Sequence, residues 1–413
     1  MTKRLQFCLF ALIIAVGAFL RLFRLGTPAD YMFDEIYHVP TFILISRGDA
    51  RAYEWWHQEL TAEFGEGAYI DWLHPPLAKL FQAICVLLGG NQPVVWRLPS
   101  SLFGIGMIIA VFAFTRALFP HSSLTALLAA ALIAIDGLAV SMSRIAMNDI
   151  FVSTWCVVAL YGYWQFCRRP RSARQLKWLW VWTLATGFAC ASKWSGWLLF
   201  PFYFFWEMFQ VTLFGLYKDR VVWARLLFSG CIAVAIYVLS YGQMFALGYG
   251  WAHFVQLQDQ ILNYQLNLDA THTYASKAYE WPLGLKPVHL YHDAQTGSNY
   301  WNKPFYPSWY LCLGALVALL VFLGMDLGRT LKKRRLSRAE CFIAFACAHE
   351  AVLFCLTAYF ALWVPWIFSP RIMYFHHYLP AVPFLVILAG RVLAVLLERP
   401  ITMPQKSQKD LTN

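Results

Sequence analysis

The sequence has little charge for its length. Charged residues make up 13% of its 413 positions, whereas soluble chains carry about 25%. Hydrophobic residues make up 60%, and they form long charge-free runs such as 150–166 and 226–245. Runs of this length are typical of membrane spans. The composition therefore excludes an ordinary soluble enzyme, a nucleic-acid-binding module and a disordered chain.

Patterns that bind metals or form disulfide frameworks are also missing. The ten cysteines all lie in or at the end of apolar segments, and none forms a C-x-x-C pair. The sequence has no D-x-D pair, no H-x-x-x-H cluster and no internal repeat. We therefore expect small core cysteines, no metal site and no cofactor. The inverted repeats that are typical of many transporters are therefore not visible in this sequence.

The apolar runs predict an all-α polytopic membrane protein with about ten spans. The expected spans are 8–25, 98–118, 122–141, 150–167, 178–192, 196–216, 226–245, 308–325, 340–362 and 375–397. The first follows Lys3 and Arg4 and has no small-residue cleavage site, which predicts an uncleaved anchor.

An eleventh apolar run, 77–90, has only 14 residues, whereas a crossing helix needs about 20. If it does not cross, both termini and three basic connections lie on the cytoplasmic side. These are 168–177 with five basic residues, 326–340 with six, and the stretch that holds Lys218, Arg220 and Arg225. The positive-inside rule therefore places 77–90 on the outer surface as an interfacial helix. The same rule explains the net charge of +11, because the basic residues gather in the connections on the cytoplasmic side.

This topology divides the chain into three parts. Residues 1–245 form an N-terminal transmembrane catalytic module with a long external loop, 26–97. Residues 246–307 form a second external loop, and 308–413 form a C-terminal transmembrane module with a cytoplasmic tail. The first loop holds nine acids against four basic residues, and both loops are rich in aromatics. Loops this long are functional or disordered, and the aromatic content argues against disorder.

The same topology gathers the informative polar residues on the outer face. The candidates are Asp34, Glu35, His74, Arg97, Asp136, Arg144, Asp149, Lys193 and Arg371. Ionisable groups at membrane depth are costly unless they are paired or functional. A carboxylate can act as a general base on a hydroxyl, and Arg or Lys can bind a phosphate leaving group. The set therefore suggests transfer from a phosphate-linked donor to a hydroxyl acceptor.

Each candidate also has a structural interpretation. The two adjacent acids can be solvated loop charges, and His74 before two prolines can be a turn residue. Asp136 and Arg144 can form a structural ion pair, and Lys193 can extend from the end of a span. Arg97 and Arg371 can anchor helix ends at the headgroups. His349 and Glu350, inside the expected ninth span, can line a cavity, but they have no assigned role.

Several motifs, in order along roughly 20–390, resemble the protein O-mannosyltransferase family of GT-C membrane glycosyltransferases. They are FDEIYH, HPPLAK, WRLPS, DGLAVSMSRIAMNDIF, SKWSG, YASKAYEWPL and PRIMYFHHYLPAVPF. Eukaryotic members insert a β-trefoil-type domain before the C-terminal spans. Here the corresponding loop, 246–307, is only about 60 residues long, so the chain resembles a bacterial-type member.

The resemblance also implies roles for individual residues. Asp34 looks like the catalytic acid, with Glu35 beside it assisting acceptor placement, and His74 looks like part of the same outer-loop site. Arg144, Lys193 and Arg371 look like ligands of the donor phosphate. Arg97, Asp136 and Asp149 remain further site candidates.

The implied reaction is the inverting transfer of mannose from a polyprenyl-phosphate-mannose donor to Ser or Thr hydroxyls of exported proteins. The implied location is the plasma membrane, with an extracytoplasmic active site, contact with the bilayer and an association with the secretion machinery. Nucleic acid is not an expected partner. Two alternatives stay open: a lipid-directed transferase resembling the aminoarabinose transferases, and a transporter or flippase.

Overall fold

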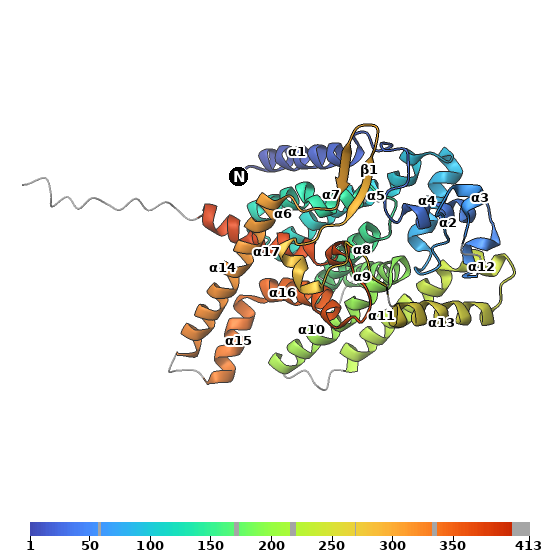
Figure 1. The fold of residues 1–413 in the computed structure, drawn as a ribbon. Coiled ribbons are helices and arrows are strands. Elements are labelled where there is room, and N and C mark those ends of the chain that lie inside the picture. Colours follow the sequence, from blue (N-terminus) through green and yellow to red (C-terminus); the bar gives the residue numbers. More distant parts are fainter. Residues whose placement is uncertain (57–58, 169–172, 215–219, 269, 333–336, 399–413) are drawn as a thin grey trace, which may run out of the picture.

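The computed structural model describes the chain except for residues 57–58, 169–172, 215–219, 269, 333–336 and 399–413. The described residues are mostly helical, with a single two-stranded antiparallel hairpin (Figure 1). The N-terminal part comprises α1 (Lys3–Leu22), α2 (Glu35–Ser46), η1 (Ala50–Tyr53), α3 (Thr61–Phe64), α4 (Leu77–Gly89), α5 (Pro93–Leu118), α6 (Ser123–Ile135) and α7 (Gly137–Ser143). The central part comprises α8 (Asp149–Cys167), α9 (Ala173–Ser192), η2 (Trp194–Leu198), α10 (Leu199–Phe214), α11 (Arg220–Ser240), α12 (Gly242–Ala246) and α13 (Trp251–Asn267).

The C-terminal part begins with the hairpin and ends with a second group of long helices. It comprises η3 (Ala278–Leu283), β1 (His289–Asp293), β2 (Ser298–Trp301), α14 (Tyr306–Leu331), α15 (Arg338–Ala348), α16 (Glu350–Trp363), η4 (Val364–Phe368), η5 (Phe375–Tyr378) and α17 (Val382–Glu398).

Six helices in the described chain are long and apolar enough to cross a membrane, and the bent pair α6–α7 makes a seventh candidate. They are Lys3–Leu22, Pro93–Leu118, Asp149–Cys167, Trp223–Ser240, Tyr306–Leu331 and Glu350–Phe368. The chain is therefore a multi-pass membrane protein, but the expected number of ten spans is not confirmed. Helices α9, α10 and α17 correspond to the other three expected spans, 178–192, 196–216 and 375–397. Of these, α10 has 16 residues and α17 has 17, which is short for a full span.

Two expected spans are broken rather than continuous. The span 122–141 bends by 58° between α6 and α7, because the Asp136 carboxylate caps α7 by accepting the Ala139 N–H at 2.7 Å. At Gly137 a β-carbon would lie 2.3 Å from the Lys303 carbonyl oxygen, so only glycine admits the backbone that passes there. The span 340–362 is interrupted at His349, whose φ of −115° and ψ of 15° separate α15 from α16.

The run 77–90 forms α4, a helix of 13 residues that begins after two prolines and is followed by Gly90, where φ is 81°. It packs against α2 and α5, while its C-terminal half exposes the apolar side chains of Ile84, Leu87 and Leu88. The helix is thus short and apolar as expected, and its place at a membrane surface stays a prediction.

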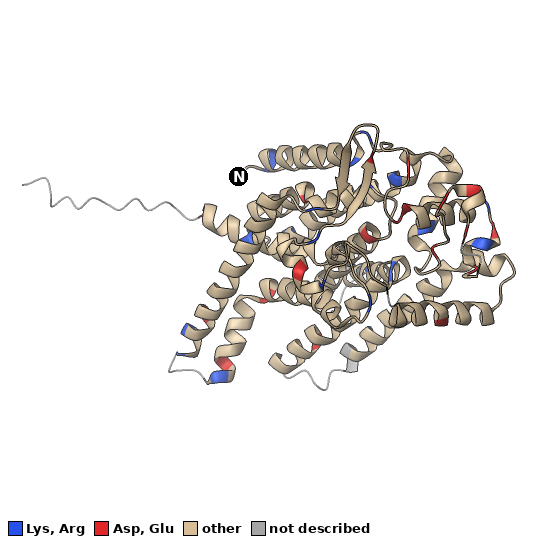
Figure 2. Cartoon of the chain, viewed as in Figure 1, with Lys and Arg blue, Asp and Glu red and all other residues tan. Residues whose placement is uncertain are grey.

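Figures 1 and 2 show that the two ends of the molecule differ. Helices α2, α3 and α4 lie together at the right, where acidic residues gather. Helices α10, α11, α14 and α15 end toward the lower left and bottom, and Lys or Arg residues mark the lower ends of α14 and α15.

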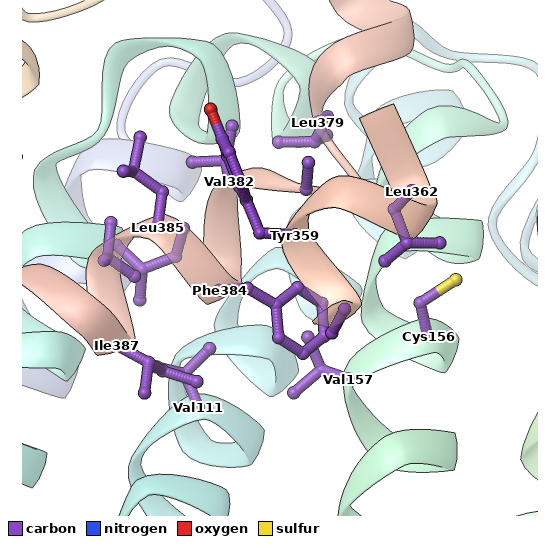
Figure 3. Close-up of a cluster of buried hydrophobic side chains, with 14 of the residues drawn as sticks. Val111, Cys156, Val157, Tyr359, Leu362, Leu379, Val382, Phe384, Leu385 and Ile387 are labelled. Atoms are coloured by element: carbon purple, nitrogen blue, oxygen red, sulfur yellow. The ribbon is translucent and has the colours of Figure 1, made fainter. Parts of the chain in front are cut away.

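The core lies where α5, α8, α16 and α17 meet (Figure 3). The Phe384 ring packs edge-on against Phe114, with centroids 6.4 Å apart. The hydroxyls of Tyr359 and Tyr378 share a buried hydrogen bond at 2.5 Å. The buried residues labelled in Figure 3 are Val111, Cys156, Val157, Tyr359, Leu362, Leu379, Val382, Phe384, Leu385 and Ile387. This packing is a rigid frame for the loops at the acidic end.

Candidate functional site

Asp34 lies at the N-terminal cap of α2, but its carboxylate does not cap the helix. The preceding residue, Phe33, has a φ of 47°, a conformation that bulky side chains rarely adopt. The Phe33 N–H donates to the Leu290 carbonyl in β1 at 2.8 Å, so the hairpin holds this turn in place. A strained turn held by a distant strand leaves the Asp34 carboxylate free to contact a ligand.

Glu35 points in another direction and is fully buried. The Arg97 guanidinium donates to both of its carboxylate oxygens, at 2.8 and 2.7 Å. The backbone N–H groups of Met32 and Ala146 complete the set at 2.9 and 2.8 Å. These contacts occupy Glu35 in fixing the start of α2 against α5 and the α7–α8 connection. These contacts favour a positioning role for Glu35, with Arg97 as its partner, and the expected role in acceptor placement stays a prediction.

Asp34 opens onto a cavity of about 470 Å³ between α2, the loop before α4, the end of α13 and the segment before η5. The residues that line it are Phe33, Asp34, Ile36, Tyr37, His38, Tyr69, Ile70, Asp71, Trp72, Leu73, His74, Tyr264, Gln265, Leu268, His272, Arg371, Ile372 and Tyr374. Among the expected site residues, the structure brings Asp34, His74 and Arg371 together on this wall. The cavity combines two carboxylates, Asp34 and Asp71, with one guanidinium and many aromatic rings.

The Asp34 carboxylate is suited to accept a proton. Burial raises its pKa from 3.8 to about 6, although His38 and Lys193 oppose the shift. Asp149 and Asp71 raise the pKa further because they repel the ionised form. A general base works best when its pKa lies near the working pH, and the environment of Asp34 moves it in that direction.

A buried network of His38, Asp71 and Lys79, of which the first two line the cavity, was not predicted from the sequence. The Asp71 carboxylate lies 2.9 Å from His38 Nδ1 and 3.1 Å from Lys79 Nζ. Burial alone would raise the pKa of Asp71, but Lys79 and His38 hold it well below 3.8. One feature of the sequence could have predicted that His38 lies near the site. His38 is four residues after Asp34, so the two side chains share one face of α2.

His74 stacks on His38 with ring centroids 6.0 Å apart. Burial lowers the pKa of His74 to about 3, so its imidazole is neutral near pH 7. A neutral imidazole can donate or accept a hydrogen bond in the cavity, but it brings no positive charge. Within the described chain, no three His, Cys, Asp or Glu side chains are grouped to hold a metal ion.

Lys193 and Asp149 form a buried ion pair at 2.8 Å. Asp149 begins α8, and Lys193 follows the end of α9. Neither lines the cavity, but Lys193 is close enough to lower the pKa of Asp34. The pair therefore acts on Asp34 through its charges and does not form part of the cavity wall.

Arg144 lies apart from Asp34. Its guanidinium donates to the carbonyls of Leu20 and Arg21 at 2.9 and 3.2 Å. It lines a separate cavity of about 360 Å³ beside β2 and the start of α14. The described residues contain no ion pair between Arg144 and Asp136, whose carboxylate caps α7. Of Arg144, Lys193 and Arg371, only Arg371 lines the cavity onto which Asp34 opens, and the expectation that all three hold the donor phosphate stays a prediction.

Two family models together match most of the chain. Residues 11–254 match the family model of dolichyl-phosphate-mannose-protein mannosyltransferases. Residues 250–412 match the C-terminal four-transmembrane region of protein-O-mannosyltransferases. The polyprenol-phosphate-mannose–protein mannosyltransferase of Mycolicibacterium smegmatis is 25% identical over 96% of this chain and 83% of its own. The enzyme of the same name from Mycobacterium tuberculosis is 24% identical over 79% of this chain and 71% of its own.

Two solved structures share the fold at low sequence identity. The S. cerevisiae protein O-mannosyltransferase Pmt1–Pmt2 complex bound to the sugar donor superimposes with a TM-score of 0.78 at 14% identity. That match covers 99% of this chain and 87% of the yeast chain. ArnT from Cupriavidus metallidurans bound to undecaprenyl phosphate gives a TM-score of 0.60 at 16% identity, over 95% and 60% of the two chains. With a family model that spans more than half of its length, this chain belongs to the dolichyl-phosphate-mannose-protein mannosyltransferase family of membrane glycosyltransferases.

Proposed function

We propose that this protein transfers a mannosyl residue from a polyprenyl-phosphate-mannose donor to a Ser or Thr hydroxyl of an exported protein. The family match and the names of the mycobacterial relatives support this substrate pair. In the proposed step, the acceptor oxygen attacks C1 of the mannose, and the bond between C1 and the phosphate oxygen breaks. Polyprenyl phosphate leaves with the bonding electrons, and the anomeric configuration inverts.

Asp34 takes the proton of the attacking hydroxyl in this mechanism. Its carboxylate makes no capping hydrogen bond, and burial raises its pKa to about 6. Arg371 is half-buried on the same cavity wall, where its guanidinium can pair with the departing phosphate. The observation that carries the proposal is that Asp34 and Arg371 line one cavity, because the reaction needs a base and an anion-binding group at one place.

The rest of the cavity supports a sugar and a peptide as joint occupants. The side chains of Tyr37, Tyr69, Trp72, Tyr264 and Tyr374 line it. They provide apolar faces together with hydroxyl and indole donors. The sequence-based expectation that the reaction needs no cofactor stays part of the proposal.

A lipid-directed sugar transferase is a second candidate for the same site. The likeness to ArnT supports a common fold. We favour the protein acceptor because the matched family model and the mycobacterial relatives are named protein mannosyltransferases.

We further propose that the cavity faces the extracytoplasmic side of the plasma membrane, near the secretion machinery that delivers unfolded acceptors. The basic connections 168–177 and 326–340 support this orientation. Cysteines introduced at Ser172 and Ser298 should react from opposite sides of sealed vesicles, with Ser172 inside. Ser172 lies outside the described residues, and Ser298 begins β2. Labelling of Ser172 from the outside would overturn this orientation.

The decisive test is an assay of purified protein in a bilayer, with polyprenyl-phosphate mannose and either a Ser/Thr peptide or a lipid acceptor. We expect mannosyl peptide from the native chain and none from Asp34→Asn. Asp259→Asn is the matched control because Asp259 is an exposed acid on α13 that does not line the cavity. Transfer to the lipid but not to the peptide would favour the second candidate, and transfer to neither would overturn the proposal.

A further inference from the structure

In Figure 1 the break between α15 and α16 lies far from α2, the helix that Asp34 precedes. The sequence predicts one continuous span there, but the helix stops at Ala348 and restarts at Glu350. Irregular backbone at membrane depth persists only where protein buries it or where it lines a cavity. Ionisable residues at such a break, here His349 and Glu350, commonly mark a binding site.

The structure has a cavity of about 580 Å³ at this break, within the usual range for small-molecule sites. It is lined by Leu118, Phe119, Arg168, Ala318, Leu319, Phe322, Cys347, Ala348, His349, Glu350, Ala351, Val352, Arg391, Val392, Val395 and Leu396. Most of these side chains are apolar, and the polar ones are confined to Arg168, His349, Glu350 and Arg391. The cavity therefore has the character of a site for a molecule with a long apolar part and a small polar part.

Of the charged side chains that line this cavity, one cation has no ion-pair partner among the described residues. The Arg168 guanidinium pairs with Glu350, and His349 Nε2 lies 3.0 Å from the Asp326 carboxylate. Arg391 lies with its guanidinium carbon 5.2 Å from the centre of the Phe119 ring. Among the described residues, no acid forms an ion pair with Arg391. A ligand with an anionic group would supply the missing partner.

The depth of the cavity indicates how such a ligand would lie. Arg168 caps the end of α8, at the level where basic residues meet lipid headgroups. Ala318 lies deeper, near the middle of α14, at about 20 Å from the end of that helix. Beside the cavity, α14 exposes Val317, Val321 and Phe322 on its surface. In a membrane spanned by α14, the cavity would extend from the headgroup level into the hydrocarbon region, beside a surface of exposed apolar side chains.

We propose that this cavity is a binding site for an anionic phospholipid of the membrane leaflet at the basic end of the molecule. The phosphate would contact Arg391, and one acyl chain would lie along α14 and α17 over the α15–α16 break. Basic pockets between membrane helices on the cytoplasmic side bind acidic headgroups in this manner. The inference goes beyond the proposed mannosyl transfer and does not depend on it, because no residue of the Asp34 cavity takes part.

The test is native mass spectrometry of delipidated protein, with phosphatidylglycerol or phosphatidylcholine of matched acyl chains. We expect retention of phosphatidylglycerol and a rise in Tm that phosphatidylcholine does not give. Arg391→Gln should weaken phosphatidylglycerol binding about tenfold, the effect of losing one charge-assisted contact. Arg329→Gln is the matched control, because Arg329 is an exposed cation in the last turn of α14 that does not line the cavity.

A second variant, Val395→Trp, fills the cavity without a change of charge and should also abolish retention. It keeps the test decisive if Arg391→Gln fails to fold. Equal retention of the two lipids, or equal losses in the Arg391 and Arg329 variants, would overturn the proposal. Retention of polyprenyl phosphate in place of phosphatidylglycerol would also overturn it, because the site would then serve the donor lipid.

Discussion

The two ends of the molecule each have a cavity with ionisable side chains, but among the described residues the Asp34 cavity leaves an acid and a cation, Asp34 and Arg371, without an ion pair, whereas the other leaves only a cation, Arg391. At the Asp34 cavity the structure pairs Glu35 with Arg97 and Asp71 with Lys79, and the Asp34 carboxylate is left without a capping contact. At the α15–α16 break the structure pairs both nearby acids, Glu350 and Asp326. An available carboxylate suits proton transfer, whereas an available guanidinium suits the binding of an anion. The two sites therefore differ in which ionisable groups have an ion-pair partner, more than in the residue types that line them.

The sharpest test of this comparison is Asp34→Asn. Loss of the general base should lower transfer by about 10²- to 10⁴-fold, measured as initial rate at saturating donor. Stability should not fall, because burial raises the pKa of Asp34 above 3.8 and ionised Asp34 therefore disfavours the folded state at neutral pH. The Tm of the variant should equal or exceed that of the native chain. Full activity would remove Asp34 as the base.

The neighbouring substitution, Glu35→Gln, should act on stability instead. It leaves the fully buried Arg97 without its carboxylate partner, and breaking a buried pair costs about 3–5 kcal/mol. We expect a large fall in Tm and in folded yield, with catalysis by the remaining folded fraction less affected. The double variant Glu35→Gln with Arg97→Met should recover part of the stability. A stable Glu35→Gln protein with raised acceptor KM would instead restore the role in acceptor placement.

Arg371→Gln and Arg144→Gln compare two half-buried cations in different cavities. Loss of a charge-assisted contact to the donor phosphate should raise the donor KM of Arg371→Gln about 10- to 100-fold. Arg144→Gln should lower Tm, because it loses hydrogen bonds to the Leu20 and Arg21 carbonyls, with little change in donor KM. The reverse pattern, from the same steady-state kinetics, would place the phosphate beside Arg144.

The pH dependence of transfer should report Asp34 directly. Because its pKa is raised to about 6, activity should fall about tenfold for each pH unit below that value as the carboxylate becomes protonated. Size-exclusion chromatography at each pH serves as the control for folding. Asp34→Glu, if active, should show a shifted midpoint, and a profile flat between pH 5 and 7 would argue against an Asp34 base.

The smallest effect is expected for Glu350→Gln at the opposite end. Its ion pair with Arg168 is partly exposed, with 31% and 48% of the two side chains accessible. Pairs of this kind contribute about 0–1 kcal/mol. Transfer activity should match that of the native chain, and Tm should change little. Strong loss of transfer in this variant would show that the two ends are functionally coupled and would break the comparison.

The sequence alone determined the class of the protein and singled out Asp34 as the candidate base. Low charge and long apolar runs require membrane helices, because unpaired charges are costly in hydrocarbon. The length of 77–90 predicted a helix too short to span the membrane, and α4 has that length. The motifs in FDEIYH and HPPLAK identified Asp34 and His74, which the structure places on one cavity. These inferences depend on local properties, such as run length and spacing, which a sequence states directly.

Only the tertiary structure decided what each charged residue does. Glu35 and Arg97 are 62 residues apart in the chain, yet they form a fully buried ion pair, while the neighbouring Asp34 lines the cavity. The same packing places Arg144 in a cavity separate from that of Asp34, and it places His38 next to Asp71. It also broke the expected span 340–362 at His349. The role of an ionisable group depends on its burial and on which opposite charge lies within about 4 Å. Both are fixed by the packing of distant segments, and neither is written in the local sequence.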